Sequence, residues 1–541
     1  MNAKSIRHRG RGLVVAIAAA AMVAACGSQS GDTGNGDGSD KSLTIALPAV
    51  PNNLDIQPYG GPGTSYVLAG LSSTLFTYDT SKVPGEGCDQ LAGLDAITGQ
   101  LVDTWSLSGD RKSIKLTLKD QTSANGNKLT AEDVKWSIER AIAIASVAKT
   151  TLTQTAEYDA DNPVTVVDEK TAQLNLKNSL PIDTAVLTHP MTTIYDSVEA
   201  KKHATGDDPW ANKWMQTNLA VFGPWKLDSF TPGDQVVLVP NPNFTGPRGN
   251  LTKVTFKGVP DDSTRAQLIR RGTVQFAVSL SYSQFSSLDG AAGVTAKQCV
   301  SPTRDTLILN LNDPALSKVE VRQAISMAID RKALIQGAYR DLAKPAVSGV
   351  SGSYPGVSPQ KTYTFDVAKA KQLLADAGYP NGFPLELTFS TTRVANAPQS
   401  AVLLQTMLKQ IGIDVTLNNV AAAATFADLY YASKYQAVIY QEPPAVAYPY
   451  YAFKAYNTGT SGQNTYGFKN AQFDQLVQQL GASSDAQQQT SLINQLADLS
   501  VDTMPEVYLT DDAALYAYSS SVTGLKPSPY GPLSPVDLSR S

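Results

Sequence analysis

The chain has 541 residues, of which 44 are basic and 48 acidic, and its net charge at pH 7 is −4 with histidine neutral. This mildly acidic balance argues against nucleic acid as a partner, because phosphate recognition needs a basic surface. The length exceeds what one compact core normally contains and predicts two or three lobes. With three histidines in the whole chain, a histidine-rich metal site is not expected.

The N-terminus has the pattern of an export signal. Four basic residues fall within residues 4–11, and residues 13–25 are almost wholly apolar. This run is about half the ~20 residues that a membrane-spanning helix needs, so residues 1–25 are predicted to be a cleaved signal. The tetrad Val23-Ala24-Ala25-Cys26 resembles a bacterial lipobox, which implies that Cys26 is lipidated and becomes the new N-terminus. The alternative is an ordinary secretory signal that ends near a cysteine.

A polar segment follows the signal. Residues 27–42 contain five glycines, three aspartates, four serines and no apolar side chain. Such a segment cannot bury enough surface to offset its ordering entropy, so residues 26–42 are predicted to carry the lipid and to form a flexible tether. Removal of residues 1–25 leaves 40 basic and 48 acidic residues and a net charge of −8. No later apolar run predicts a second membrane segment.

Helical and strand patterns alternate through much of the remaining chain, which favours α/β lobes. Strands are predicted at residues 43–47, 101–107, 113–119, 307–311 and 436–440, the first from the alternation of apolar with polar or small residues.

Two predicted helices have clear ends. Thr130 and Asp133 form a pair like a capping box, and the second helix begins at Asp366 and ends at Gly378. The core is expected to include the tryptophans Trp105, Trp136 and Trp225.

Cys88 and Cys299 are the two cysteines that follow Cys26. Outside the cytoplasm a pair like this can form a disulfide, and neither residue has the neighbours of a metal site. A disulfide between them is therefore predicted, and two buried free thiols are the alternative.

Five segments in chain order resemble those of one family. They are NGNKLTAEDVKWSIERAI, VFGPWKLDSFTPGDQVVLVPNPNF, VTFKGVPDDSTRAQLIRRGTVQFA, NLNDPALSKVEVRQAISMAIDRKALI and DVAKAKQLLADAGYPNGFPLEL. They are similar to segments of the bacterial extracellular solute-binding proteins, family 5, which serve peptide and nickel ABC importers. The resemblance covers nearly the whole chain after the signal. It implies an α/β fold of the class II periplasmic-binding-protein type, a two-lobed clam with an extra subdomain inserted in the first lobe.

The resemblance also implies domain limits and partners. Lobe I is expected at 43–77, 206–298 and 510–541, the inserted subdomain at 78–205 and lobe II at 299–509. The chain would cross between the lobes near residues 299 and 509. The expected protein is a monomer without cofactor or metal. It is held by its lipid on the outer face of the cytoplasmic membrane, binds a small-molecule or peptide ligand and docks on ABC permease subunits.

The densest aromatic region is the expected ligand wall. Nine of the 23 tyrosines lie between residues 430 and 466, and tyrosine offers contact area and a hydroxyl at low entropic cost. Residues 440–442 follow a predicted strand, and strand ends that face a crevice bind ligands in open α/β lobes. The candidates here are Tyr440, Gln441, Glu442, Tyr448, Tyr450 and Tyr451. The alternative for each tyrosine is a place in the core of lobe II.

One departure from the family concerns the ligand's amino group. Peptide-binding relatives carry an aspartate here that pairs with the free amine, whereas this chain has Ala445 at the aligned position. Glu442 is the residue that can supply the carboxylate instead.

Two further sets are candidates for ligand binding. Asn53, Asp55 and Tyr59 follow the first strand, where they either face the cleft or form a surface or subdomain-contact loop. Arg304 and Asp305 precede the strand at 307–311, where the arginine can form a forked pair with a ligand carboxylate or pair with its neighbour.

The favoured function is a substrate-binding lipoprotein of an ABC importer, with a short peptide as the first choice of solute. The alternatives are an oligosaccharide or metal chelate as the solute, an exported hydrolase, and a signalling or chaperone-like binder on the same fold. The hydrolase is disfavoured because neither a Gly-x-Ser-x-Gly elbow nor a His-Glu-x-x-His helix occurs.

Overall fold

The computed structural model describes residues 41–58, 64–144, 147–391, 393–528 and 533–541. The predicted signal, Cys26 and Tyr59 lie outside these ranges, as does the tether up to residue 40. No helix within them combines the length and apolar character that crossing a membrane requires.

A mixed sheet of eleven strands is the largest element of the described residues. Ten strands form a continuous path, and β13 pairs with β17 beside it. In spatial order they are β15 (Asp414–Asn419), β14 (Pro384–Phe389), β16 (Ala437–Glu442), β12 (Val294–Leu309), β17 (Val507–Ser519), β11 (Phe276–Ala277), β1 (Ser42–Leu47), β10 (Lys253–Gly258), β9 (Gln235–Pro240) and β8 (Trp225–Thr231), with β13 at Lys344–Pro345.

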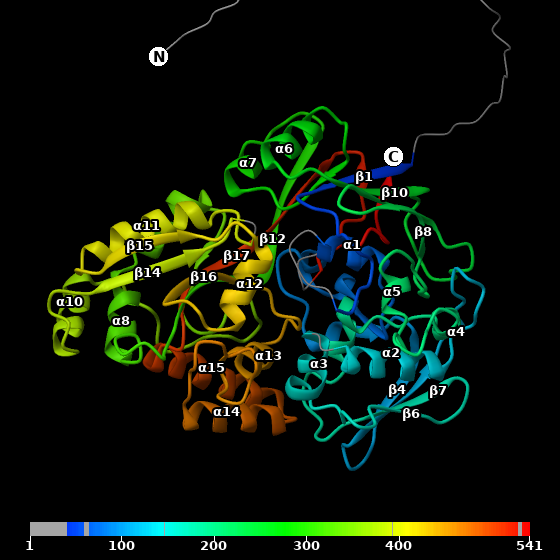
Figure 1. The fold of residues 1–541 in the computed structure, drawn as a ribbon, viewed down its shortest axis with the longest axis horizontal. Coiled ribbons are helices and arrows are strands. Elements are labelled where there is room, and N and C mark those ends of the chain that lie inside the picture. The colour runs from blue at the N-terminus through cyan, green and yellow to red at the C-terminus, as the bar shows by residue number, and fades with distance from the viewer. Residues whose placement is uncertain (1–40, 59–63, 145–146, 392, 529–532) are drawn as a thin grey trace, which may run out of the picture. The chain divides into compact units, whose positions relative to one another are not determined.

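The two long strands β12 and β17 join the two halves of this sheet (Figure 1). They pair antiparallel along most of their length, and the register shifts between Val300 and Arg304 of β12. Beyond this shift β12 pairs with β16 on its other side. The C-terminal end of β17 pairs with β11. The chain thus passes twice between the halves, through two neighbouring strands.

The β14–β16 half of the sheet is covered on both faces. Because side chains alternate along a strand, Leu307, Leu309 and Ile439 pack into one apolar cluster, and Ile308 and Val438 pack into another. The first cluster includes residues of α8 (Val319–Ala328), α9 (Arg331–Leu334), α10 (Val367–Asp376) and α11 (Ala397–Lys409). The second includes residues of α12 (Ala423–Tyr431), α13 (Pro449–Ala452), α14 (Ala471–Ala482) and α15 (Ala486–Thr503).

Shorter elements accompany the other half of the sheet. The helices are α1 (Thr64–Leu71), α4 (Ser197–Lys201), α5 (Asn212–Met215), α6 (Asp262–Arg270) and α7 (Tyr282–Ser286). A separate four-stranded sheet has the order β4 (Val102–Leu107), β5 (Ser113–Leu118), β7 (Thr171–Asn175) and β6 (Val164–Val166), and α2 (Ala131–Ala143) and α3 (Val147–Thr150) follow β5 in the chain. Two small pairs are β2 (Phe76–Tyr78) with β3 (Ile97–Gly99) and β18 (Val522–Thr523) with β19 (Ser539–Arg540).

Local signals gave the helix ends correctly. The Asp133 carboxylate accepts a hydrogen bond from the Thr130 backbone N–H at 2.8 Å at the start of α2. The Asp366 carboxylate accepts from the Lys369 N–H at 2.8 Å at the start of α10. Gly378 follows that helix with φ +93°, a left-handed conformation that glycine adopts without a steric penalty.

Three expectations from the sequence are wrong. The strand predicted at 307–311 is the end of β12, which runs from Val294 to Leu309, so Arg304 and Asp305 lie within the strand and do not precede it. The predicted strand at 436–440 is β16, which runs on to Glu442 because Gln441 and Glu442 still pair with β12. Trp105 was expected in the core but is 41% exposed. It lies on the edge strand β4, which has only one neighbour, and its ring contacts Phe76 edge-on at 5.1 Å. Trp136 and Trp225 are buried as expected.

Cys88 and Cys299 are joined by a disulfide. Cys88 lies between β2 and β3, and Cys299 lies on β12 opposite Ala514 of β17. The bond ties the segment between β2 and β3 to the strand pair that joins the two halves of the large sheet.

Candidate functional site

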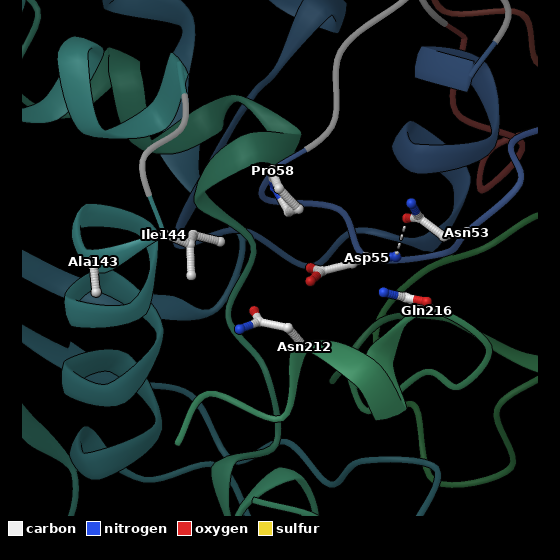
Figure 2. Close-up of a pocket in the computed structure, with 7 residues that line it drawn as sticks. All are labelled: Asn53, Asp55, Pro58, Ala143, Ile144, Asn212 and Gln216. Atoms are coloured by element: carbon white, nitrogen blue, oxygen red, sulfur yellow. Dashed lines mark hydrogen bonds between the residues drawn. The ribbon is translucent and has the colours of Figure 1, made fainter. Parts of the chain in front are cut away.

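Two cavities contain residues that the sequence singled out, and they share no lining residue. The larger has a volume of about 400 Å³ and is open to solvent. Figure 2 shows its lining, which consists of Asn53, Asp55, Pro58, Ala143, Ile144, Asn212 and Gln216.

Asp55 has a structural role at this larger cavity. Its side chain is 3% exposed, and both carboxylate oxygens are bound by the guanidinium of Arg140 from α2. One of these hydrogen bonds, from Nη1 to Oδ1, measures 3.0 Å. Tyr195 donates to the same oxygen at 3.1 Å, and Asn53 accepts a hydrogen bond from the Asp55 backbone N–H at 3.2 Å. A buried carboxylate that is fully paired in this way holds the loop against α2.

The smaller cavity lies at the strands β12, β16 and β17. Its volume is about 20 Å³, which is room for one water-sized group. The lining residues are Pro302, Arg304, Gly349, Val350, Ser351, Tyr354, Glu442, Pro444, Ala452, Tyr456 and Tyr508.

Strand register brings two predicted residues together here. Arg304 of β12 stands directly opposite Glu442 of β16, so both side chains project from the same face of the sheet. Arg304 is 6% exposed and donates from Nε to Asp511 Oδ1 at 3.0 Å and from Nη2 to the Ser348 carbonyl at 2.6 Å. Its guanidinium lies 3.9 Å from the ring centroid of Tyr508.

Arg304 and Asp305 do not pair with each other, contrary to one of the two alternatives drawn from the sequence. Adjacent strand residues point to opposite faces, so Asp305 faces away from Arg304. Asp305 accepts from the Tyr339 hydroxyl at 2.7 Å and from Gln441 Nε2 at 3.2 Å. Gln441 also donates to Asp512 at 3.0 Å, so it lies between two buried acids on the face opposite the cavity.

Glu442 has an incompletely paired carboxyl group. The residue is 5% exposed, and its carboxyl group lies close to that of Glu506. Its Oε1 has no hydrogen-bond partner among the described residues. Burial, followed by the neighbouring charge of Glu506, raises the pKa of Glu442 well above its usual value. A buried acid of this kind in a cavity is a typical functional-site feature.

Glu506 is the partner that the sequence analysis missed. It precedes β17 and accepts from Tyr466 at 2.7 Å, from Asn457 at 3.0 Å and from Thr306 at 3.2 Å. Burial also raises the pKa of Glu506. An acid directly before an apolar strand is the signal that could have drawn attention to it.

The tyrosine-rich stretch mainly packs this part of the protein. The ring of Tyr440 is stacked on Tyr430 at 4.2 Å, and its hydroxyl accepts a hydrogen bond from Arg393 at 3.0 Å. Tyr450 and Tyr451 are almost fully buried in the apolar cluster. Tyr448 donates its hydroxyl hydrogen bond to Gln489 at 3.0 Å.

Three other tyrosines, Tyr354, Tyr456 and Tyr508, line the smaller cavity; none was among the sequence candidates. Across the residues described, no group of three or more histidine, cysteine or acidic side chains is arranged to hold a metal ion.

Comparison with known proteins identifies the family. Residues 96–464 match the family model described as bacterial extracellular solute-binding proteins, family 5 Middle. A curated relative, the probable D,D-dipeptide-binding periplasmic protein DdpA of Escherichia coli K12, is 28% identical over 442 residues, which are 80% of this chain and 82% of the relative.

Solved structures share the fold. The periplasmic binding protein DppA of Helicobacter pylori in complex with the peptide STSA has a TM-score of 0.80 at 21% identity, over 92% of this chain and 98% of that one. NikA of Staphylococcus aureus in complex with Ni(L-His)2 has a TM-score of 0.76 at 21% identity, over 93% of this chain and 100% of that one. These likenesses show a two-lobed α/β fold.

Proposed function

Because the chain belongs to the bacterial extracellular solute-binding proteins, family 5, we propose that it is the substrate-binding component of an ABC importer that captures its solute next to Glu442. The observation that carries the placement of the site is the buried Glu442 Oε1, which lacks a partner among the described residues and lines a cavity together with Arg304. This cavity adjoins the strand pair that joins the two halves of the sheet. A group of the solute that enters this cavity is well placed to bias the two lobes towards closure.

The favoured solute is a short peptide. Two of the similar proteins are named for peptide ligands, and Glu442 offers a carboxylate for a free amino group where the family's usual aspartate is replaced by Ala445. Since NikA carries a nickel chelate on the same fold, a chelate is the second candidate, and an oligosaccharide is the third.

The proposed lobes follow the expected limits. Lobe II comprises residues 299–509, lobe I comprises 43–77, 206–298 and 510–541, and the inserted subdomain comprises 78–205. The long strands β12 and β17 support this division, because the predicted crossings near 299 and 509 lie within them. Among the predicted ligand residues, Glu442 and Arg304 are favoured, since they alone line the smaller cavity.

The proposed location is the outer face of the cytoplasmic membrane, where the lipid on Cys26 and the polar segment after it would keep a monomeric receptor near its permease. Replacement of Cys26 by serine should move the protein from the membrane fraction to the soluble fraction. A variant that stays with the membrane would contradict the anchor and leave solute binding untouched.

Native mass spectrometry of the protein without residues 1–26, purified gently from its own host, tests the choice of solute. Bound masses spaced by amino-acid residues would support a peptide receptor. A single sugar or chelate mass would replace the peptide and keep the receptor. Turnover of a substrate offered in excess would instead favour the exported hydrolase.

A further inference from the structure

The proposed inserted subdomain and the proposed lobe II also meet through side chains outside β12 and β17. Leu180 and Tyr450 belong to one apolar cluster and are 9% and 2% exposed. Gly481 of α14 lies against both, because a methyl group added at its Cα would be 3.1 Å from Leu180 Cδ2 and 3.1 Å from the Tyr450 hydroxyl oxygen. Glu157 accepts a hydrogen bond from Lys454 Nζ at 3.2 Å. These five residues are called the seam below.

Only side chains hold the seam together. Among the described residues, no backbone hydrogen bond and no strand pairing joins residues 150–190 to residues 440–485. The side chains of the ion pair between Glu157 and Lys454 are about one quarter exposed, so water screens their attraction. A contact of this kind can form and separate without breaking any secondary structure.

Asp183 shapes the turn that carries Leu180 into the seam. Asp183 Oδ2 accepts a hydrogen bond from the Leu180 backbone N–H at 2.9 Å, and the Asp183 N–H donates to the Leu180 carbonyl at 3.2 Å. Asp183 Oδ1 is buried and has no hydrogen-bond partner among the described residues. A buried carboxylate with an unpaired oxygen is costly, whereas the protonated acid carries no charge. The buried turn therefore favours the protonated form of Asp183.

The groups around Asp183 agree with a neutral acid. The titratable groups that act on it or on which it acts are Arg111, Glu157, Tyr158 and Tyr450. Burial raises the pKa of both tyrosines, so they stay neutral. Burial also raises the pKa of Asp183 to about 7, and the charge of Glu157 adds to this rise while that of Arg111 opposes it.

We propose that the seam is a latch that closes the receptor in the absence of solute and is released when Asp183 loses its proton. In the closed state the neutral Asp183 holds Leu180 against Gly481 and Tyr450. When the seam separates, water reaches the carboxyl group, Asp183 ionises and one proton leaves for the solvent. The inference rests on the proposed function for the movement of the two lobes, and it holds for any solute that they enclose.

The pH dependence of the latch has a fixed sign. The pKa of Asp183 is about 7 in the seam and about 3.9 when the group is exposed to water. The stabilisation of the closed state is therefore complete below the lower value and is lost as pH rises through the higher one. The ratio of closed to open receptor should fall by up to about tenfold per pH unit between these values and become constant above them.

Distance measurements between two spin labels test the latch. Asp161→Cys and Gln475→Cys provide exposed attachment points on the two sides of the seam. The residues from Lys41 onwards form one compact unit, so the chain without residues 1–26 is used after dialysis to remove retained solute. Double electron–electron resonance should show mainly a short distance at low pH and a longer one at high pH. A single long distance at both pH values, or a short distance that does not change, would overturn the proposal.

Two variants should act in opposite directions. Gly481→Ala places a methyl group in the seam and should lower the ratio of short to long distances at low pH by about fivefold or more. Gly109→Ala is its control in the inserted subdomain, because an added methyl group there meets no atom within 4 Å, and it should leave the ratio unchanged. A wedge variant as closed as the parent would contradict the latch.

Asp183→Asn keeps the side chain neutral at every pH. This variant should remain closed at high pH, where the parent protein opens. Misfolding does not explain a variant that closes more than its parent, so this result would be specific to the latch. If Asp183→Asn opens with the same pH dependence as the parent, another acid controls the movement and the proposal is wrong.

The outcomes are separate from those of the proposed function, because no solute is present in the measurement. Failure of the latch together with a retained solute in the native mass spectrum would keep the receptor and remove the latch. A pH-dependent distance change that responds to both variants, in a protein that retains no solute, would support the latch and leave the importer role without support.

Discussion

Asp55 and Glu442 are both buried carboxyl groups at positions that the sequence singled out, yet their surroundings are opposite. Both oxygens of Asp55 are bound by Arg140, so its charge is neutralised within the fold. Glu442 faces another acid, and one of its oxygens has no partner in the described part of the protein. Burial of an acid therefore does not indicate function by itself. The state of its hydrogen bonds separates a structural carboxylate from a binding one.

The largest effect is expected from Arg140→Met. This change leaves Asp55 buried without its cation and should lower the free energy of unfolding by about 3–5 kcal/mol. Urea unfolding followed by circular dichroism measures the loss. The double variant Asp55→Asn with Arg140→Met should recover part of it, because the unpaired charge is gone. A loss below about 1 kcal/mol would mean that the pair behaves as a surface ion pair. Asp55 would then not be the structural carboxylate with which Glu442 is contrasted.

The next effect concerns the bond that ties the segment between β2 and β3 to β12. Replacing Cys88 and Cys299 by serine opens a link across 211 residues and should lower stability by about 2–4 kcal/mol. Thermal unfolding with and without a reducing agent measures the change. The reducing agent should lower the melting temperature of the parent protein and leave that of the double serine variant unchanged. Equal sensitivity of both proteins to the reducing agent would rule out this disulfide.

Glu442→Gln tests the second of these two buried carboxyl groups. The folded-state pKa of Glu442 is raised by burial, so its contribution to stability is fully present below the unfolded pKa of about 4.3 and is lost as pH rises through the folded value. The amide removes this loss, so the variant should be more stable than the parent at pH 8 by about 1 kcal/mol. Denaturant midpoints of the variant and the parent at pH 4 and pH 8 measure the difference in stability at the two ends of this pH range. Strong destabilisation at pH 8 would give Glu442 the structural role of Asp55.

The smallest effect is expected from Lys454→Met. Lys454 Nζ lies 3.2 Å from Glu157 Oε1, with both side chains about one quarter exposed (23% and 25%), and the pair joins the proposed lobe II to the proposed inserted subdomain. If the pair favours the closed state, its loss should weaken ligand binding by less than about 1 kcal/mol, and the difference should disappear at high salt. Dissociation constants at low and high ionic strength check this. A salt-independent difference would indicate a packing effect instead.

Local elements and the family could be read from the sequence, because the signals for them lie within a few residues. Thr130 with Asp133 and Asp366 with Lys369 begin helices through hydrogen bonds within one turn, and Gly378 ends a helix through its own backbone conformation. The family segments are likewise continuous runs. Glu442 was reached in the same way, from a strand end and a missing aspartate next to it.

The tertiary structure decided which of these residues share a site. Arg304 lies opposite Glu442 and pairs with Asp511, 207 residues further along the chain, and strand register turns Asp305 to the other face. The same packing of distant elements gave Arg140 to Asp55, left Trp105 exposed on an edge strand and placed Glu506 beside Glu442. Sequence fixes a residue's local conformation and chemistry, but the pairing of groups that are hundreds of residues apart depends on register and packing.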